Sequence, residues 1–261
     1  MICCTPTVLD DAHEHPLEFK SNKRTLYRCG GCKEIGFGPF YECGSCNFQL
    51  HEECTNLSST SSSPTTHSLF ENVQFIFQKQ PPENVGSCVA CGMNVQGFRY
   101  HEYSRPKKNA FVGLFVPTKE LVLHPCCFRL PSNKTTPEGV TNINLELKEK
   151  APSNCLICQR KKISKKIQGW AYVSTCGEYC YHVKCVKESV DKKFDQQSDG
   201  TDASSLRLEV THMVVEVGVD ILVVLALIIQ AIFGDPLSAI VSLVMYFNKQ
   251  KILGQKKLTA G

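Results

Sequence analysis

The sequence lacks the extremes of composition that mark disordered chains and polytopic membrane proteins. Its 261 residues carry 29 Lys and Arg against 25 Asp and Glu, a formal net charge of only +4. Hydrophobic residues make up 42% and charged residues 21%, close to the averages of globular proteins. We therefore expect folded units, because enough apolar surface is present to offset the cost of ordering the chain.

The first residues also lack the features of an export signal. No basic segment and no apolar run of signal-peptide length precedes Asp10 and Asp11, whereas a secretory signal needs both. We therefore expect an intracellular protein, in the cytoplasm or the nucleus, that is not secreted. Thiols persist in such reducing compartments and disulfides are rare there.

Cysteine, by contrast, is abundant, with 16 Cys beside 8 His. In a reducing compartment, paired Cys with nearby His predict zinc sites rather than disulfides. Three Cys/His clusters occur along the chain, each opening with a Cys-x2-Cys pair that a His-x2-Cys follows, and this recurrence indicates a structural repeat. The pairs are Cys29/Cys32, Cys88/Cys91 and Cys155/Cys158, followed by His51/Cys54, His124/Cys127 and His182/Cys185.

The first repeat has the most complete set of ligands. It contains a second Cys-x2-Cys pair, Cys43/Cys46, with His13 and His15 ahead of the repeat and His67 behind it. A Cys-x2-Cys pair places two thiolates at adjacent corners of a tetrahedron, and a second pair of ligands closes the shell of a structural zinc site. The repeat therefore has enough ligands for two such shells.

These residues resemble the divergent C-one domains of plant cysteine/histidine-rich proteins, relatives of the diacylglycerol-binding zinc domains of protein kinase C. The resemblance covers about residues 13 to 190 and rests on the stretches HPLEF, CGGC, FYECGSCNFQLHEEC, LHPCCFRLP and GWAYVSTCGEYCYHVKCV. It implies small β-rich units, each with a short helix and two interleaved zinc sites. It also implies two ligand sets in the first repeat, which are Cys29, Cys32, His51 and Cys54, and His15, Cys43, Cys46 and His67. His67 also stands where the second repeat could begin.

The later repeats depart from this pattern. In the second, His101 and Ser104 stand where the resemblance expects the inner Cys pair, and Ser is a poor zinc ligand. In the third, Cys176 and Cys180 are separated by three residues instead of two. We therefore expect one zinc in each of these repeats and four in the chain, although three or five would also fit the ligands. The cysteines expected to be free thiols are Cys3, Cys4 and Cys126.

The expected zinc sites are structural, because every shell is filled by four protein ligands that are mostly thiolates. A catalytic zinc keeps one position open for water. The sequence contains neither His-Glu-x-x-His nor the combined His-x-Glu and Pro-Cys-x-x-Cys motifs of zinc deaminases. We therefore expect a protein that is not an enzyme and that has no catalytic residues.

Beyond the repeats the sequence turns hydrophobic. The segment from Ile221 to Phe247 is predominantly apolar and is interrupted by Gly234-Asp235-Pro236. It is long enough to cross a bilayer, but Gly-Asp-Pro more naturally ends one helix and begins another. Three arrangements fit this pattern. The segment could be a transmembrane span, a helical hairpin on a membrane or partner, or helices that pack back on the protein or self-associate.

The predicted fold class is a tandem of small zinc-stabilised β-rich (α+β) domains, followed by a C-terminal hydrophobic α-helical segment. Short repeats of this kind need metal because each is too small to bury a sufficient core. The expected division is a complete zinc domain at 13–67, a degenerate one with an insertion at 68–131, a partial one at 150–190, a polar linker at 191–205, the hydrophobic helical segment at 206–247 and a basic tail at 248–261.

These features predict an interaction or adaptor protein of intracellular signalling with an unidentified protein partner. The hydrophobic segment would allow membrane-surface association, and the basic run at 160–166 would suit anionic lipid or nucleic acid. Diacylglycerol is not expected, because the segment between Cys32 and Cys43 lacks the glutamine-glycine feature of responsive domains. The same ligands would also fit a plant-homeodomain-like chromatin reader, which would join Cys88 and Cys91 to the first repeat, or a RING-like ubiquitin-ligase adaptor.

Overall fold

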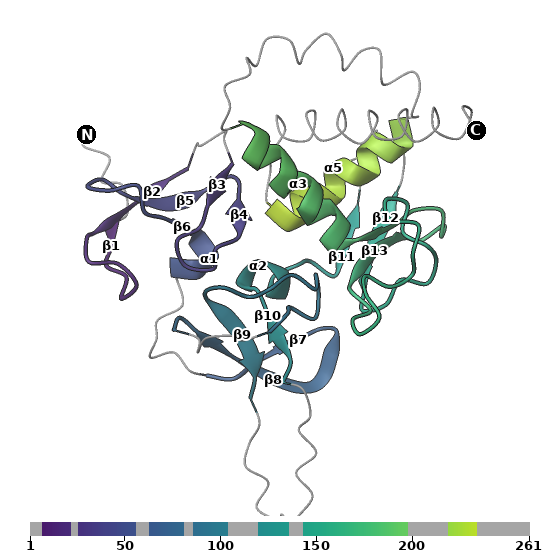
Figure 1. The fold of residues 1–261 in the computed structure, drawn as a ribbon, viewed down its shortest axis with the longest axis horizontal. Helices are drawn as coiled ribbons and strands as arrows, with labels where there is room; N and C mark the ends of the chain where they lie inside the picture. Colours follow the sequence, from purple (N-terminus) through teal and green to yellow (C-terminus); the bar gives the residue numbers. More distant parts are fainter. Residues whose placement is uncertain are drawn as a thin grey trace, which may run out of the picture.

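The structure is a computed structural model that describes residues 7–21, 26–55, 63–80, 86–103, 120–135, 143–197 and 219–233. It contains three small β-rich units, which we call the first (7–55), second (63–130) and third (133–197), and a further helix near the end of the described chain (Figure 1). The predicted basic tail, most of the predicted linker, the remainder of the hydrophobic segment, Cys3, Cys4 and Ser104 lie outside the described residues.

The first unit is built on an antiparallel sheet of four strands in the order β1-β2-β5-β6. Leu17 lies opposite Cys43 and Phe40 opposite His51 in this sheet, so metal ligands are placed directly on its strands. A separate hairpin, β3-β4, carries the first Cys-x2-Cys pair. The elements are β1 (Thr7–Val8), β2 (Leu17–Lys20), β3 (Tyr27–Arg28), β4 (Ile35–Gly36), β5 (Phe40–Cys43), β6 (Gln49–His51) and α1 (Glu52–Thr55).

The second unit repeats this plan with a sheet in the order β10-β9-β8-β7. Its last strand leads into a short helix that begins at Pro125, a residue suited to the first helical position because it has no N–H to leave unpaired. The elements are β7 (Thr65–His67), β8 (Phe70–Gln78), β9 (Arg99–Glu102), β10 (Val122–Leu123) and α2 (Pro125–Phe128).

The third unit has a sheet in the order β11-β12-β13-β14. Its first two strands precede residue 150, where the sequence-based boundary was placed, and its helix continues through the first part of the predicted linker. The elements are β11 (Asn133–Thr135), β12 (Asn144–Lys148), β13 (Ala171–Ser174), β14 (Cys180–His182) and α3 (Val183–Gln197).

The three units are packed together and share their largest hydrophobic core. Ile35 and Phe37 of the first unit belong to the same cluster of buried residues as Phe75 of the second and Tyr172 of the third. The short sheets therefore bury apolar surface against one another, which compensates for the small size of each unit.

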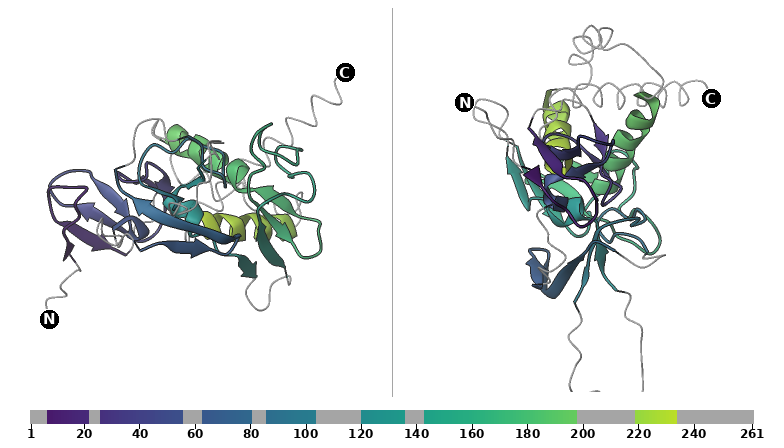
Figure 2. Two further views of the ribbon diagram at one scale, coloured as in Figure 1. Left: turned by 90° about the horizontal axis from the view of Figure 1, so that it is seen from below. Right: turned by 90° about the vertical axis from the view of Figure 1, so that its left-hand side faces the viewer.

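The helix α5 (Val219–Phe233) completes this core. It contacts α3, β11 and α2, and in both views of Figure 2 it lies within the body of the molecule. Of the three arrangements expected for the hydrophobic segment, residues 219–233 therefore follow packing against the protein. No helix in the described part of the chain has the length and apolarity needed to cross a bilayer. The buried side chains of α5 are Val224, Leu225, Leu227, Ile228, Ile229, Ile232 and Phe233.

The first and second units meet at the first Cys-x2-Cys turn. The Phe98 N–H donates a hydrogen bond of 3.0 Å to the Gly31 carbonyl. A Cβ at Gly97 would clash with this carbonyl, so only glycine allows the two backbones to approach this closely. A buried ion pair of 2.9 Å between Lys79 and Asp10 joins the same two units.

Candidate metal centres

Four groups of Cys and His side chains converge in the described part of the structure. In each group the four potential ligand atoms lie within 4.8 Å of one another. The first centre is Cys29, Cys32, His51 and Cys54, the second centre is Cys88, Cys91, His124 and Cys127, the third centre is Cys155, Cys158, His182 and Cys185, and the outer centre is His13, His15, Cys43 and Cys46.

The Cys-x2-Cys pairs of the first, second and third centres lie on the same backbone turn. In each, the residue four positions after the first Cys donates its N–H to that Cys carbonyl, at 3.0 Å for Lys33, 2.7 Å for Gly92 and 2.8 Å for Gln159. These three residues have positive φ values of 66°, 69° and 57°. Lys33 and Gln159 adopt this left-handed conformation at a cost of about 1–2 kcal/mol each. Other interactions of the turn must therefore offset this cost.

The other two ligands of these centres come from a strand end and the helix that follows it. His51 and His182 end β6 and β14, and His124 follows β10. The last Cys of each centre lies in the next helix, three residues after the His. All three centres thus have the same order of a strand, a His ligand, a helix and a Cys ligand. The repeat in the sequence is therefore also a repeat of ligand geometry.

The spacing of these donor atoms fits a zinc ion. Bond lengths of about 2.3 Å to sulfur and about 2.05 Å to nitrogen place S and N about 3.6 Å apart in a tetrahedron. The distances from Nδ1 of the His to two of the three sulfurs are 3.3 and 3.8 Å in the first centre, 3.4 and 3.9 Å in the second, and 3.4 and 3.8 Å in the third. The donor set of three thiols and one imidazole is also one that zinc prefers.

Each imidazole is also contacted on the side of the ring away from Nδ1. His124 Nε2 lies 3.2 Å from the Asn94 carbonyl and His182 Nε2 lies 3.2 Å from the Lys161 carbonyl. Such contacts fix the tautomer with Nδ1 facing the metal. In the first centre, Gly36 lies against the His51 ring, where a Cβ would clash with it.

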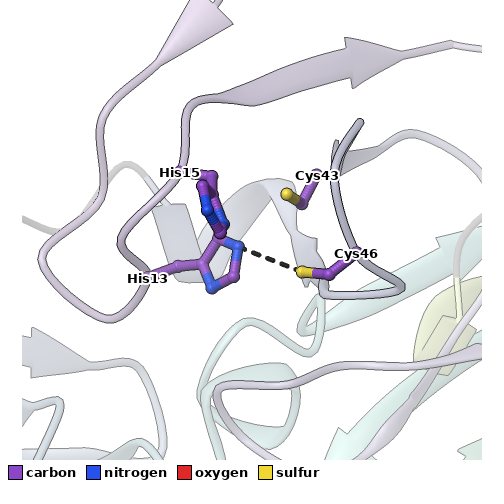
Figure 3. Close-up of side chains that lie close together, drawn as sticks. All are labelled: His13, His15, Cys43 and Cys46. Atoms are coloured by element: carbon purple, nitrogen blue, oxygen red, sulfur yellow. Dashed lines mark hydrogen bonds between the residues drawn. The ribbon is translucent and has the colours of Figure 1, made fainter.

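The outer centre joins the segment before β2 to the turn after β5 (Figure 3). His13 Nε2 lies 3.3 Å from Cys46 Sγ, and the His13 ring stacks on Phe48 with centroids 4.2 Å apart. The Ser45 N–H donates to Cys43 Sγ at 3.3 Å. Two sulfurs and two imidazoles make a complete set of four ligands, and three of them are exposed or half-buried.

The structure places His13, and not His67, beside His15, Cys43 and Cys46. His67 lies in β7, where its ring packs against Trp170 at 4.8 Å and Phe128 at 5.2 Å. Its Nδ1 accepts the Leu69 N–H at 3.1 Å, and burial lowers the pKa of its imidazole. The assignment of His67 as a ligand is therefore corrected, because its side chain belongs to the core between the second and third units.

Comparison with protein families matches residues 11–55 to the C1 domain. Residues 11–55 form a divergent C1 domain. The matched stretch of this C1 domain contains all eight ligands of the first and outer centres and ends before His67. No curated protein and no solved structure matches the chain.

Replacing the two candidate histidines separates their roles. The substitution His13→Ala should lower the bound metal from four ions to three, because it removes a ligand of the C1 domain's outer centre. The substitution His67→Ala should leave four ions bound and lower only the stability, through lost packing on Trp170. Metal content after dialysis against a weak chelator, measured by atomic emission, distinguishes the two. Loss of one metal from the His67 variant alone would reverse the assignment.

The second sites expected of a full C1 pattern are not formed by the described residues of the later units. His101 Nδ1 instead lies 2.7 Å from Glu120 Oε1, at hydrogen-bond distance. Cys176 contacts Ser174 Oγ at 3.1 Å, and Cys180 faces the Ser153 carbonyl at 3.7 Å. The described chain thus has the four centres expected from the sequence, one of them in each later unit.

The grouping of ligands also decides between two folds considered from the sequence. A plant-homeodomain finger would need Cys88 and Cys91 to complete a site of the first repeat. Both lie instead with His124 and Cys127 of their own unit. The structure therefore contradicts the plant-homeodomain grouping.

The thiols within one centre differ in how readily they ionise. Burial raises the pKa of the Cys29 thiol, but hydrogen bonds from Cys32 and Cys54 bring it well below its ordinary value. The hydrogen bond from Cys185 outweighs burial and lowers the pKa of Cys155 to about 3. One thiol of each of these two centres is therefore the easiest to ionise, whereas the pKa values of the neighbouring thiols are raised, so metal has to displace their protons. Affinity should fall as the pH falls, because protons compete for the same ligands.

Proposed function

We propose that the protein is a zinc-binding interaction protein of intracellular signalling whose zinc ions are structural and not catalytic. One observation carries this proposal: each unit has a centre of three sulfurs and one imidazole nitrogen in the same geometry. Four protein ligands close a tetrahedral shell and leave no position for a water molecule. Zinc held in this way supplies folding free energy and fixes the surfaces that bind partners.

The surface best suited to a partner lies on the third unit. Arg160, Lys161, Lys162, Lys165 and Lys166 are exposed, and none of them forms an ion pair with another described residue. Ile163 is buried beneath them and its N–H bonds the Gln168 carbonyl at 3.1 Å. The segment 160–166, which we call the basic loop, is therefore a cationic surface on an ordered backbone.

A pocket of about 300 Å³ lies beside the basic loop. Its walls include three basic side chains and Glu188, which pairs with Lys184 at 3.5 Å. The apolar side chains of Ile157 and Ile163 and two ligands of the third centre complete the lining, in which the basic residues are Arg160, Lys184 and Lys192 and the ligands are Cys158 and Cys185. Basic residues outnumber the single carboxylate and lie beside apolar side chains, a combination that suits an acidic peptide segment carrying a hydrophobic side chain. We therefore propose that the partner is a protein with such an acidic segment.

Charge reversal tests this surface. Replacing the four lysines of the basic loop with Glu should weaken binding of a fluorescent Glu-rich peptide about tenfold or more, because each contact becomes repulsive. The matched control replaces Lys20 and Lys148 with Glu, because both lysines are exposed away from the basic loop. This control should bind the peptide with the affinity of the original protein. Fluorescence anisotropy at two salt concentrations measures both, since an electrostatic contact weakens with added salt.

Two results would contradict the proposed partner. Equal peptide affinity in the loop variant and the control would show that the basic loop is not the binding surface. Tighter binding of anionic vesicles or duplex DNA than of the peptide, lost in the same loop variant, would assign the loop to lipid or nucleic acid.

A further inference from the structure

Three polar side chains, one from each unit, meet in the interior of the molecule. Glu34 directly follows the turn that carries the first Cys-x2-Cys pair. His124 is a ligand of the second centre, and Lys187 lies in α3 two residues after Cys185, a ligand of the third. This buried triad of Glu34, His124 and Lys187 therefore lies at the junction of the three units and near all three of their centres.

The contacts within the buried triad are direct. His124 Nε2 lies 2.9 Å from Glu34 Oε1, and Lys187 Nζ forms an ion pair with Glu34 Oε2. The Lys187 ammonium also reaches Cys127 Sγ at 3.8 Å and Cys126 Sγ at 3.6 Å. The exposed fractions of the side chains are 10% for Glu34, 0% for His124 and 2% for Lys187, so little water can screen these interactions.

Stability alone does not explain why the buried triad is charged. Removing a carboxylate and an ammonium from water costs several kcal/mol for each ion, and apolar side chains of similar size are often as stable in such places. An ion pair nearer the surface, such as that of Lys184 and Glu188 within α3, avoids most of this cost. The triad should therefore have a role tied to the groups that it contacts.

Those groups are the ligands of the second centre. Nδ1 of His124 faces the sulfurs of Cys91 and Cys127. Its Nε2 lies 2.9 Å from the Glu34 carboxylate and 3.2 Å from the Asn94 carbonyl. A carboxylate behind a ligating imidazole fixes the ring and makes it a stronger donor to the metal. Three thiolates and a divalent ion leave one net negative charge in the centre, and the Lys187 ammonium beside Cys127 offsets it.

We propose that Glu34 and Lys187 are positioning residues for the second metal centre, and that they couple its metal affinity to the docking of the first and third units. The inference rests on the proposed binding of zinc at this centre. The second centre then binds metal with full affinity only when all three units are assembled, because neither the carboxylate nor the ammonium comes from its own unit.

The substitution Glu34→Gln tests this coupling, because it removes the charge and keeps the size of the side chain. It should weaken metal binding at the second centre about 10- to 100-fold, the usual effect of losing a partner of a ligating His. Competition with a chromogenic chelator measures the affinity. Alkylation of the released thiols followed by mass spectrometry shows which centre lost its metal, and Cys88 and Cys91 should react before Cys29 and Cys155.

A second variant separates positioning from a purely structural role. Glu34→Gln leaves Lys187 without its ion-pair partner, so the double variant Glu34→Gln/Lys187→Met removes that buried charge as well. It should regain the stability lost in the single variant while metal affinity at the second centre stays low. The control Glu18→Gln alters a half-exposed carboxylate of the first unit and should change neither property.

The metal affinities of these variants test the role of Glu34. Recovery of full metal affinity in the double variant, or unchanged affinity in the single variant, would overturn the positioning role of Glu34. Failure of the original protein to bind zinc at all would instead overturn the proposed function. The original protein is measured first, so the two failures are distinguishable.

Discussion

Removing the metal with a strong chelator is expected to unfold the three units together. The first unit shows why, because its core cluster of eight buried residues, one of them Phe98 of the second unit, includes four candidate ligands, namely Cys29, Cys32, Cys43 and Cys54. Without metal, little apolar surface remains to hold that unit. A structural zinc contributes about 10–16 kcal/mol in small zinc domains, as much as the whole stability of a typical domain. The β-sheet circular dichroism and the dispersed NMR spectrum should therefore both be lost.

The order of metal loss provides an internal control for this experiment. The outer centre, with exposed His15 and Cys46, should release its metal first and leave most of the fold intact. The buried centres should release theirs together with unfolding, and added zinc should restore the native spectrum. Treatment with chelator already saturated with zinc should have no effect. A native spectrum in fully metal-free protein would contradict the structural role of the metal.

The second large effect is expected in α5. Ile228 is completely buried in the shared core, and the substitution Ile228→Ala should lower the free energy of unfolding by about 2–5 kcal/mol through lost burial and a residual cavity. Urea unfolding of the zinc-saturated protein measures this change. We expect the midpoint to shift without a change in slope, because the extent of surface exposed on unfolding stays nearly the same.

The nearby residue Gln230 provides the matched control, because it lies in the same helix and is only partly buried. The substitution Gln230→Ala should change stability by about 0.5 kcal/mol or less. If the Ile228 and Gln230 variants unfold at the same urea concentration, α5 does not pack in the core. The hydrophobic segment would then have to be a transmembrane span or a hairpin that lies on a membrane or a partner.

Most of the metal ligands could be predicted from the sequence because their spacing reflects local structure. A Cys-x2-Cys pair needs one tight turn, and a His-x2-Cys needs a strand end and the first turn of a helix. These are short-range requirements that leave a fixed spacing in the chain. The same reasoning predicted small β-rich units and one centre in each of the later repeats.

The choice between His13 and His67 could not be made in this way, because both are far in sequence from Cys46. Only the tertiary fold shows that His13 stacks on Phe48 and faces Cys46, whereas His67 packs on Trp170. The end of the family match at residue 55 agrees with this outcome.

The shared core and the buried triad also could not be predicted from sequence patterns. Contacts between units produce no periodic pattern in the sequence. In the sequence alone Glu34 is indistinguishable from other charged turn residues, and only the fold places Lys187 beside it. For the same reason, α5 was equally compatible with a membrane, a partner or the protein core until its packing was known.

Each of the four Cys/His centres should hold one metal ion on its four ligands. Cadmium NMR of protein in which cadmium replaces zinc measures this, because the chemical shift of each ion reports its sulfur and nitrogen donors. Four resonances are expected, three from sites with three sulfurs and one nitrogen and one from a site with two of each. Fewer resonances, or a site with four sulfurs, would contradict this expectation.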